Sequence, residues 1–306
     1  MAADQTFTLY GVKIASTLLG GITSQNMKPG MKVDTPLGSG QARGRAQFIP
    51  EGKPSFDFST YAVASGITAL TALGRLIANL SGGVVMYGQY HEEGSTRKTG
   101  ASHVSYTYAS GMIVPVRLTC SDRKYAELAV NGMVTYDGSK APVVPATGAT
   151  LPGGLVETEY FGLGPWTVGG VLIPEVTNLD LAFGLNIVAR GSESKQFDTC
   201  IRVEDIRPVI TLKGLAPTIF SAAVVPLNGR VATHANTKGF LRRYDPSTGT
   251  FYADNVAQHL KVTAAGLAVI SSVDAGQGEA EITVEMPVKF DNTNECLMFD
   301  VASTVS

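Results

Sequence analysis

The chain has 306 residues and a formal charge of −2, from 24 Lys and Arg against 26 Asp and Glu. This near-neutral balance excludes the global basic field that draws a protein to nucleic acid or to a membrane surface. The length suits two ordinary domains, and with 44% hydrophobic residues each half can bury a core. Only 16% of the residues are charged. Either sequence bias or a surface covered by neighbouring copies in an assembly explains so few charges.

The N-terminal segment MAADQTFTLY has neither the charged nor the apolar region of a signal peptide, and no apolar run reaches the about 18 residues of a membrane span. We therefore expect a protein that is made in the cytosol and has no membrane partner. The three cysteines, Cys120, Cys200 and Cys296, are widely spaced and odd in number. They predict reduced thiols rather than a disulfide framework or a metal site, and we expect no cofactor.

Alternation of apolar and polar residues predicts strands in both halves of the chain. Early examples are Phe56-Asp57-Phe58 and the region around Tyr106–Tyr108, and a later one covers 209–213. The clearest is GEAEITVEMPVKF (278–290), in which every second residue from Ile282 is apolar. Pro287 predicts a bulge or an unpaired point late in this strand. With frequent Asn-Gly and Asp-Gly turns, the pattern predicts a mainly β fold built from hairpins.

One helix is expected after Thr60, because apolar residues recur there at spacings of three and four. These residues are Ile67, Leu70, Leu73, Ile77 and Leu80. The corresponding segment of the second half, 214–225, is shorter and contains Pro217. We expect its helix to be shorter or distorted.

The segment APVVPATGATLPGG (141–154) is uncharged and rich in Pro, Gly and Thr, which is typical of an extended linker. We therefore expect one domain over 1–145 and a second over 146–306. The glycine-rich segments 38–44 and 88–100 are predicted to be hairpin tips, where neighbouring subunits usually meet.

The apolar pattern of the first half reappears 154 residues later. The matching blocks, none needing a gap, are 18–33 over 172–187, 51–58 over 205–212 and 126–137 over 280–291. Three blocks in order at a single offset predict two whole copies of one domain, since the repeat is far longer than those of solenoid proteins.

Sequence signatures of catalysis are absent: the chain has no P-loop, no nucleophile elbow, no H-E-x-x-H and no C-x-x-C. His91 lies beside Glu92 and Glu93, a pairing that could suggest acid–base chemistry. Arg97 and Lys98 follow in the same polar loop, however, which favours a solvated cluster of ion pairs. We predict that the protein is not an enzyme.

Each half resembles the tail-tube domain of long-tailed bacteriophages and of related contractile injection systems. The resemblance rests on corresponding residues in the two halves: Leu18-Leu19 and Leu172-Ile173, Ile22-Thr23 and Val176-Thr177, Gly30 and Gly184, Pro54-x-Phe56-x-Phe58 and Pro208-x-Ile210-x-Leu212. It implies a β-sandwich or partial barrel with a flanking helix in each of two tandem pseudo-repeated domains. It further implies rings, usually of six domains, whose inner strands join into one β-barrel around a lumen that conducts the genome. Two domains per chain would make the ring a trimer.

The resemblance also gives the candidate site residues. The strand 278–290 places Glu281 and Glu285 opposite its apolar row, and Glu127 occupies the equivalent place in the first half. On a lumen wall these acids would repel DNA phosphate and let the duplex slide; on an ordinary strand they would simply meet solvent. The expected inter-ring contact is the loop that contains His91, Glu92, Glu93, Arg97 and Lys98.

The expected function is therefore the major tail tube subunit of a virion. Its implied partners are further copies of itself, the tape measure protein and viral DNA in the lumen, and the baseplate and tail-terminator proteins. A baseplate, hub or tail-terminal ring protein with paired tube domains is an alternative, because it differs only in stopping at one ring. A β-sandwich carbohydrate-binding module is the alternative from another class, and it requires a cleft lined by aromatic residues.

Overall fold

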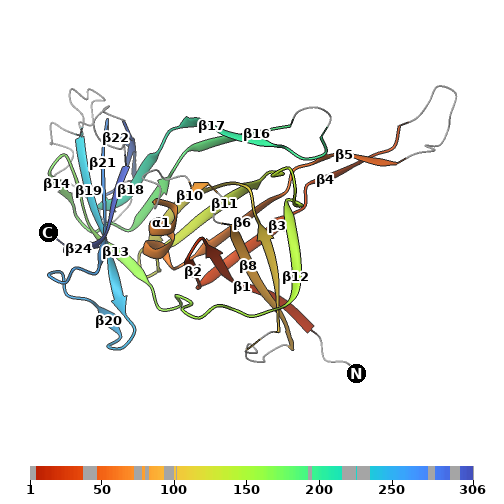
Figure 1. Ribbon diagram of the computed structural model, residues 1–306. Coiled ribbons are helices and arrows are strands. Elements are labelled where there is room, and N and C mark those ends of the chain that lie inside the picture. Colours follow the sequence, from red (N-terminus) through yellow and green to blue (C-terminus); the bar gives the residue numbers. More distant parts are fainter. Residues whose placement is uncertain are drawn as a thin grey trace.

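The computed structural model describes residues 5–36, 47–71, 78–79, 83–92, 100, 102–191, 195–215, 225, 235–274, 280–289 and 297–305. Within these ranges the chain is mainly β, and α1 (Val63–Thr71) is the only helix (Figure 1). The predicted mainly β fold is confirmed, and the packing of several sheets is consistent with a β-sandwich. No sheet of the described part closes on itself into a barrel.

Three larger sheets and two hairpins contain the strands. The first sheet has the order β12 (Val143–Ala149), β9 (His103–Tyr108), β8 (Val84–Glu92), β1 (Gln5–Ile14) and β2 (Thr17–Leu19). The second, which we call the central sheet, has the order β22 (Val269–Asp274), β23 (Glu281–Pro287), β18 (Val209–Leu215), β15 (Asn178–Ala182), β10 (Gly111–Ser121), β11 (Glu127–Val134), β6 (Ser55–Thr60) and β3 (Ile22–Lys28), with β7 (Ala78–Asn79) beside β10. The third has the order β14 (Val171–Ile173), β13 (Phe161–Val168), β19 (Ala235–Asp245), β21 (His259–Gly266) and β24 (Leu297–Ser303), with β20 (Thr250–Phe251) beside β19. The hairpins are β4 (Met31–Asp34) with β5 (Phe48–Gly52), and β16 (Leu185–Arg190) with β17 (Cys200–Ile206).

The central sheet runs through both halves of the chain. Its strands β3, β6, β11 and β10 come from the first half, and β15, β18, β23 and β22 come from the second. The antiparallel pairing of β10 with β15 joins the two sets. All ladders of this sheet are antiparallel, so one face can be buried while the other stays open.

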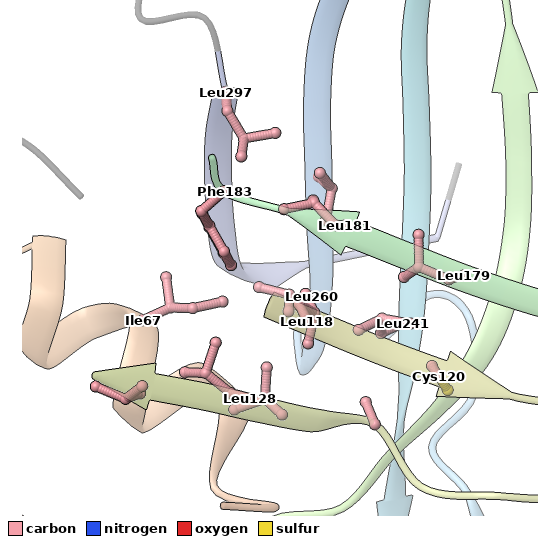
Figure 2. Close-up of a cluster of buried hydrophobic side chains, with 14 of the residues drawn as sticks. Ile67, Leu118, Cys120, Leu128, Leu179, Leu181, Phe183, Leu241, Leu260 and Leu297 are labelled. Atoms are coloured by element: carbon pink, nitrogen blue, oxygen red, sulfur yellow. The ribbon is translucent and has the colours of Figure 1, made fainter. Parts of the chain in front are cut away.

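The core lies on one face of the central sheet, against α1 and the first and third sheets. Period-two burial, clearest in β6, β18 and β11, follows from the alternating apolar residues. Figure 2 shows side chains from α1, the central sheet and the third sheet meeting in one cluster, with Ile67, Leu118 and Leu260 among them. Cys120 belongs to this cluster, and burial raises the pKa of its thiol to about 12, which makes it an inert packing residue.

The predicted helix is present but shorter than expected. Its apolar face holds Ile67 and Leu70, both buried, whereas Ala78 and Asn79 form β7 and pair with Ile113 and Met112. The prediction of a helix reaching Leu80 is therefore wrong at these two residues, because ladder hydrogen bonds to β10 replace helical ones. The expected second-half helix lies almost entirely outside the described residues.

The expected linker at 141–154 is wrong for its middle part, which forms β12 and pairs with β9 along its whole length. Pro145 and Gly148 are tolerated because β12 is the outermost strand of its sheet. The expected boundary between 145 and 146 falls inside this strand. Beyond it the chain crosses to the second half, and Val156 forms a parallel bridge with Leu19 on the way.

Strand positions recur along the chain with a spacing of 154 residues. β6 begins at Ser55 and β18 at Val209, and β11 begins at Glu127 and β23 at Glu281. The pairing of strands recurs too. In the first half β1 pairs with β2 and β8, and in the second half β13 pairs with β14 and β19. Within the central sheet, the first-half order β3–β6–β11–β10 matches the second-half order β15–β18–β23–β22.

Candidate functional site: the edges and open face of the central sheet

The central sheet ends in two exposed strands, β3 and β22. Neither has a second partner among the described strands, and their outward residues are exposed. Sheet edges of this kind are usually blunted by charges or proline. Lys28 is the one charge in β3 and Asp274 the one charge in β22, so both edges are open templates for a further strand.

The junction of β10 with β15 shows how this sheet adds a strand. Its register runs from Arg117 opposite Ala182 to Ser121 opposite Asn178. Beyond each end, backbone N–H groups still donate across the junction, from Phe183 to the Val116 oxygen (3.0 Å) and from Asp122 to the Thr177 oxygen (2.7 Å). The two halves are therefore held together by a continuous ladder.

Two polar contacts reinforce this junction on the open face. Arg117 donates two hydrogen bonds to the Asp180 carboxylate, one of them from Nε at 2.5 Å, and this interaction raises the pKa of Arg117. Ser121 donates to Oδ1 of Asn178 at 2.8 Å. Because the Arg117 side chain is about half exposed, these contacts set the register more than they add stability.

The open face carries the predicted acids. Glu127 and Glu281 lie at equivalent places, where Glu127 accepts a hydrogen bond from Thr23 Oγ1 and Glu281 accepts one from Thr177 Oγ1 at 2.8 Å. Each acid thus ties its own strand to the start of β3 or of β15, a role that sequence reasoning missed. Glu285 lies between Thr211 and Val269 of the neighbouring strands.

The charge of this face is mixed, with a small acidic excess. Besides the three predicted acids it holds Asp57, Asp180, Asp274, Lys28, Arg117 and Lys213. Lys28 pairs with Asp57 at 3.1 Å and Arg117 with Asp180, which leaves the three glutamates and Asp274 against Lys213. The face is therefore acidic where those four carboxylates lie.

The predicted inter-ring loop is only partly described. The backbones of His91 and Glu92 form the end of β8 and pair with Thr6 and Gln5. The remaining predicted residues, Glu93, Arg97 and Lys98, lie outside the described residues. Of this loop, only the backbone of His91 and Glu92 is described, and it belongs to the first sheet, whereas the three glutamates lie in the central sheet.

A buried carboxyl joins the halves on the other side of the sheet. Glu159 is 6% exposed and accepts a hydrogen bond at 3.1 Å from the backbone N–H of Ser65, in the first turn of α1. A carboxyl at this place satisfies a free helix donor. Burial nevertheless raises its pKa, since the ionised form is poorly solvated there.

Within the described ranges, no three His, Cys, Asp or Glu side chains come together as a potential metal site. The helix found there, α1, is not long and apolar enough to span a membrane. The features that sequence reasoning missed are the two open edges. The hairpin β4–β5 flanks the predicted tip at 38–44, which itself lies outside the described residues. The spacing of 154 could have located the open edges, because it aligns β10 with β22 and β15 with β3.

No protein-family model matches the chain, and no curated protein matches it significantly. The geometry of this chain is therefore the basis for its proposed function.

Proposed function

We propose that the chain is a structural virion protein, the major tail tube subunit of a long-tailed bacteriophage. The observation that carries this proposal is the central sheet, in which β10 of the first half already pairs with β15 of the second. At the two ends of this sheet lie β22, the second-half equivalent of β10, and β3, the first-half equivalent of β15. Neither has a further partner among the described strands. A second copy can therefore add its β3 to β22 as β15 adds to β10.

The proposal includes a duplication, with tail-tube-like domains over 1–145 and 146–306. Strand bounds and pairings that recur at 154 residues support it. Two local details support it further. The Thr23–Glu127 contact is repeated by Thr177–Glu281, and Gly30 and Gly184 have nearly equal positive φ angles of 61° and 58°.

The in-chain junction supplies a register for the contact between copies. The β15 residues correspond to β3 at a spacing of 154, and β10 corresponds to β22 at 155, the spacing at which β10–β11 and β22–β23 have the same register. These spacings place Lys28 of one copy opposite Ser272 of the next, and Asn26 opposite Asp274. One contact is lost, because Phe183 corresponds to Pro29, which has no N–H to donate.

This contact joins two different surfaces, so repeating it generates a ring if the rotation closes and a filament if it does not. Closure removes both open edges, which is a stable end point for a sheet of this kind. By resemblance to the tail-tube family, three chains close the ring with pseudo-six-fold symmetry, and stacked rings form the tube.

In such a ring the open face of the central sheet lines the lumen, because the core occupies the other face. Glu127, Glu281 and Glu285 then make parts of the wall acidic. They repel DNA phosphate and leave no basic groove where counterion release would hold the duplex. Viral DNA and the tape measure protein are the non-specific lumen partners, and baseplate and tail-terminator proteins meet the end rings.

Negative-stain electron microscopy of the purified protein, with mass photometry at low concentration, tests the proposal. Stacked rings or hollow tubes built from trimers are the expected result. Trimeric rings that never stack would favour the hub or terminal-ring function. A monomer that persists at high concentration would overturn any assembly function.

One observation favours a second candidate, a carbohydrate-binding module. Aromatic rings adjoin one another at the surface: Tyr125 lies 4.8 Å from Tyr160 and 5.9 Å from Tyr244, whose ring is 5.8 Å from Phe251. Tyr125 and Phe251 are both exposed. Affinity electrophoresis against a polysaccharide panel tests this function, and retardation that is lost in Tyr125→Ala would support it over the tube.

A further inference from the structure

Within one chain, the hairpin β16–β17 of the second half lies along the first half. Both of its strands contact β10, and the end of the hairpin reaches the base of β5, where the Gly52 N–H donates to the Gln196 oxygen at 2.7 Å. The Tyr136 N–H likewise donates to the Asp198 oxygen at 2.9 Å. This hairpin is a clasp that holds the neighbouring domain beside the strand junction.

The corresponding hairpin of the first half, β4–β5, has the same base but extends away from the described sheets. Lys53 N–H donates to the Gly30 oxygen and Arg207 N–H to the Gly184 oxygen, each at 3.0 Å, so both hairpins leave their sheets through the same turn. Figure 1 shows β4–β5 projecting from the body of the molecule, whereas β16–β17 passes over it.

Burial of the apolar side chains differs accordingly. Leu185 and Ile187 of β16 are half-buried, but their counterparts Met31 and Val33 are 45% and 61% exposed. Phe48 and Ile49 of β5 are exposed as well. An extended hairpin with apolar residues on its surface marks a binding element rather than an ordinary loop.

The matching receptor surface lies at the start of β22. In the first half, the β10 residue Val114 is buried and Met112 is half-buried. Their counterparts are Val269 and Leu267, because β22 pairs with β23 as β10 pairs with β11 at a spacing of 155 residues, and these two side chains are 39% and 44% exposed. These apolar positions are thus covered in the strand that β16–β17 contacts and open in the equivalent strand.

We propose that β4–β5 of one copy lies across the start of β22 of the adjacent copy in the same ring and covers Leu267 and Val269. This proposal rests on the proposed ring. It adds a second surface of contact between adjacent copies, continuous with the contact between β3 and β22. The occupant is a second copy of this chain, because the in-chain clasp is its template. Each interface then combines one added strand with one apolar arm.

Photo-crosslinking from the arm tests this contact directly. p-Benzoylphenylalanine replaces Val33, and isolated rings, whose trimeric mass is checked by mass photometry, are irradiated and mapped by mass spectrometry. Crosslinks between copies to the peptide containing Leu267 and Val269 are expected. Crosslinks that form only in stacked tubes, or only to other strands, would overturn the proposal.

A matched set of substitutions gives a second test. Val33→Asp and Leu267→Asp should each lower the assembled fraction at least about tenfold, since both remove the same apolar contact. Val256→Asp, at another exposed valine, serves as the control and should assemble normally. The melting of the isolated subunit should not change, because all three side chains are at its surface.

The arm contact and the proposed ring can be tested separately. If rings form normally in Val33→Asp and Leu267→Asp, the arm proposal is wrong and the edge contact stands. If the unmodified protein forms no rings, the proposed function fails and the arm proposal fails with it.

Discussion

The strands β10 and β22 occupy the same place in their respective halves but differ in what covers them. β10 pairs with β15 and lies under the hairpin β16–β17, whereas β22 ends the sheet. Leu118 of β10 is buried, and its counterpart Val273 of β22 is 41% exposed. The junction inside one chain thus shows what the open edge requires.

The largest effect is expected from blocking the open edge. Val273→Lys places a second charge at the end of β22, next to Asp274, where it opposes strand addition. We expect loss of rings in mass photometry while the subunit keeps its circular dichroism spectrum. Val256→Lys is the control, and rings that persist in Val273→Lys would show that β22 is not the joining edge.

Truncating a side chain should destabilise the isolated subunit more in β15 than at the equivalent position in β3. Leu181→Ala should cost about 2–5 kcal/mol, because Leu181 is fully buried at the in-chain junction. Met27→Ala should cost less than about 2 kcal/mol, because Met27, the counterpart of Leu181, is only half-buried at the open edge. Urea denaturation measures both values, and equal costs would contradict the comparison.

The pH dependence of stability should reflect Glu159. Burial raises its pKa in the folded protein above the unfolded value, so the folded state binds this proton more tightly. The stabilisation that comes from this tighter proton binding is therefore full below the unfolded pKa and is lost as pH rises through the folded pKa. Glu159→Gln introduces the residue found at the equivalent position 5 and keeps an acceptor for the Ser65 N–H.

We expect Glu159→Gln to gain melting temperature relative to the unmodified protein as pH increases from about 4.5, the usual glutamate range. Differential scanning calorimetry across pH 4 to about 8 measures this difference. A difference that stays constant with pH would mean that Glu159 titrates normally.

The smallest effect is expected for the exposed ion pair at the in-chain junction. Arg117→Met should cost less than about 1 kcal/mol, and the cost should shrink in high salt. The open edge has Ser272 and Asn26 at these two places, so this substitution makes the in-chain junction resemble the proposed one. A salt-independent loss would indicate that Arg117 acts through packing instead.

The sequence predicted the β class, the strand at Glu281 and the start of the helix, because period-two and helical patterns report local burial. It misassigned 141–154, because uncharged Pro, Gly and Thr residues suit an edge strand as well as a linker. It placed the three glutamates on the open face but missed their threonine partners, since Thr23 and Glu127 lie 104 residues apart. The open edges depend on which strands pair over long range, which periodicity does not encode.

The central claim is that β3 of one copy adds to β22 of the next in the register of the in-chain junction. Asn26→Cys with Asp274→Cys, in a Cys200→Ser, Cys296→Ser background, tests it by mild oxidation and non-reducing electrophoresis. Covalent dimers and trimers are expected, with the series ending at the trimer because the ring is closed. Monomers alone, or equal crosslinking when Val273→Cys replaces Asp274→Cys, would contradict the claim.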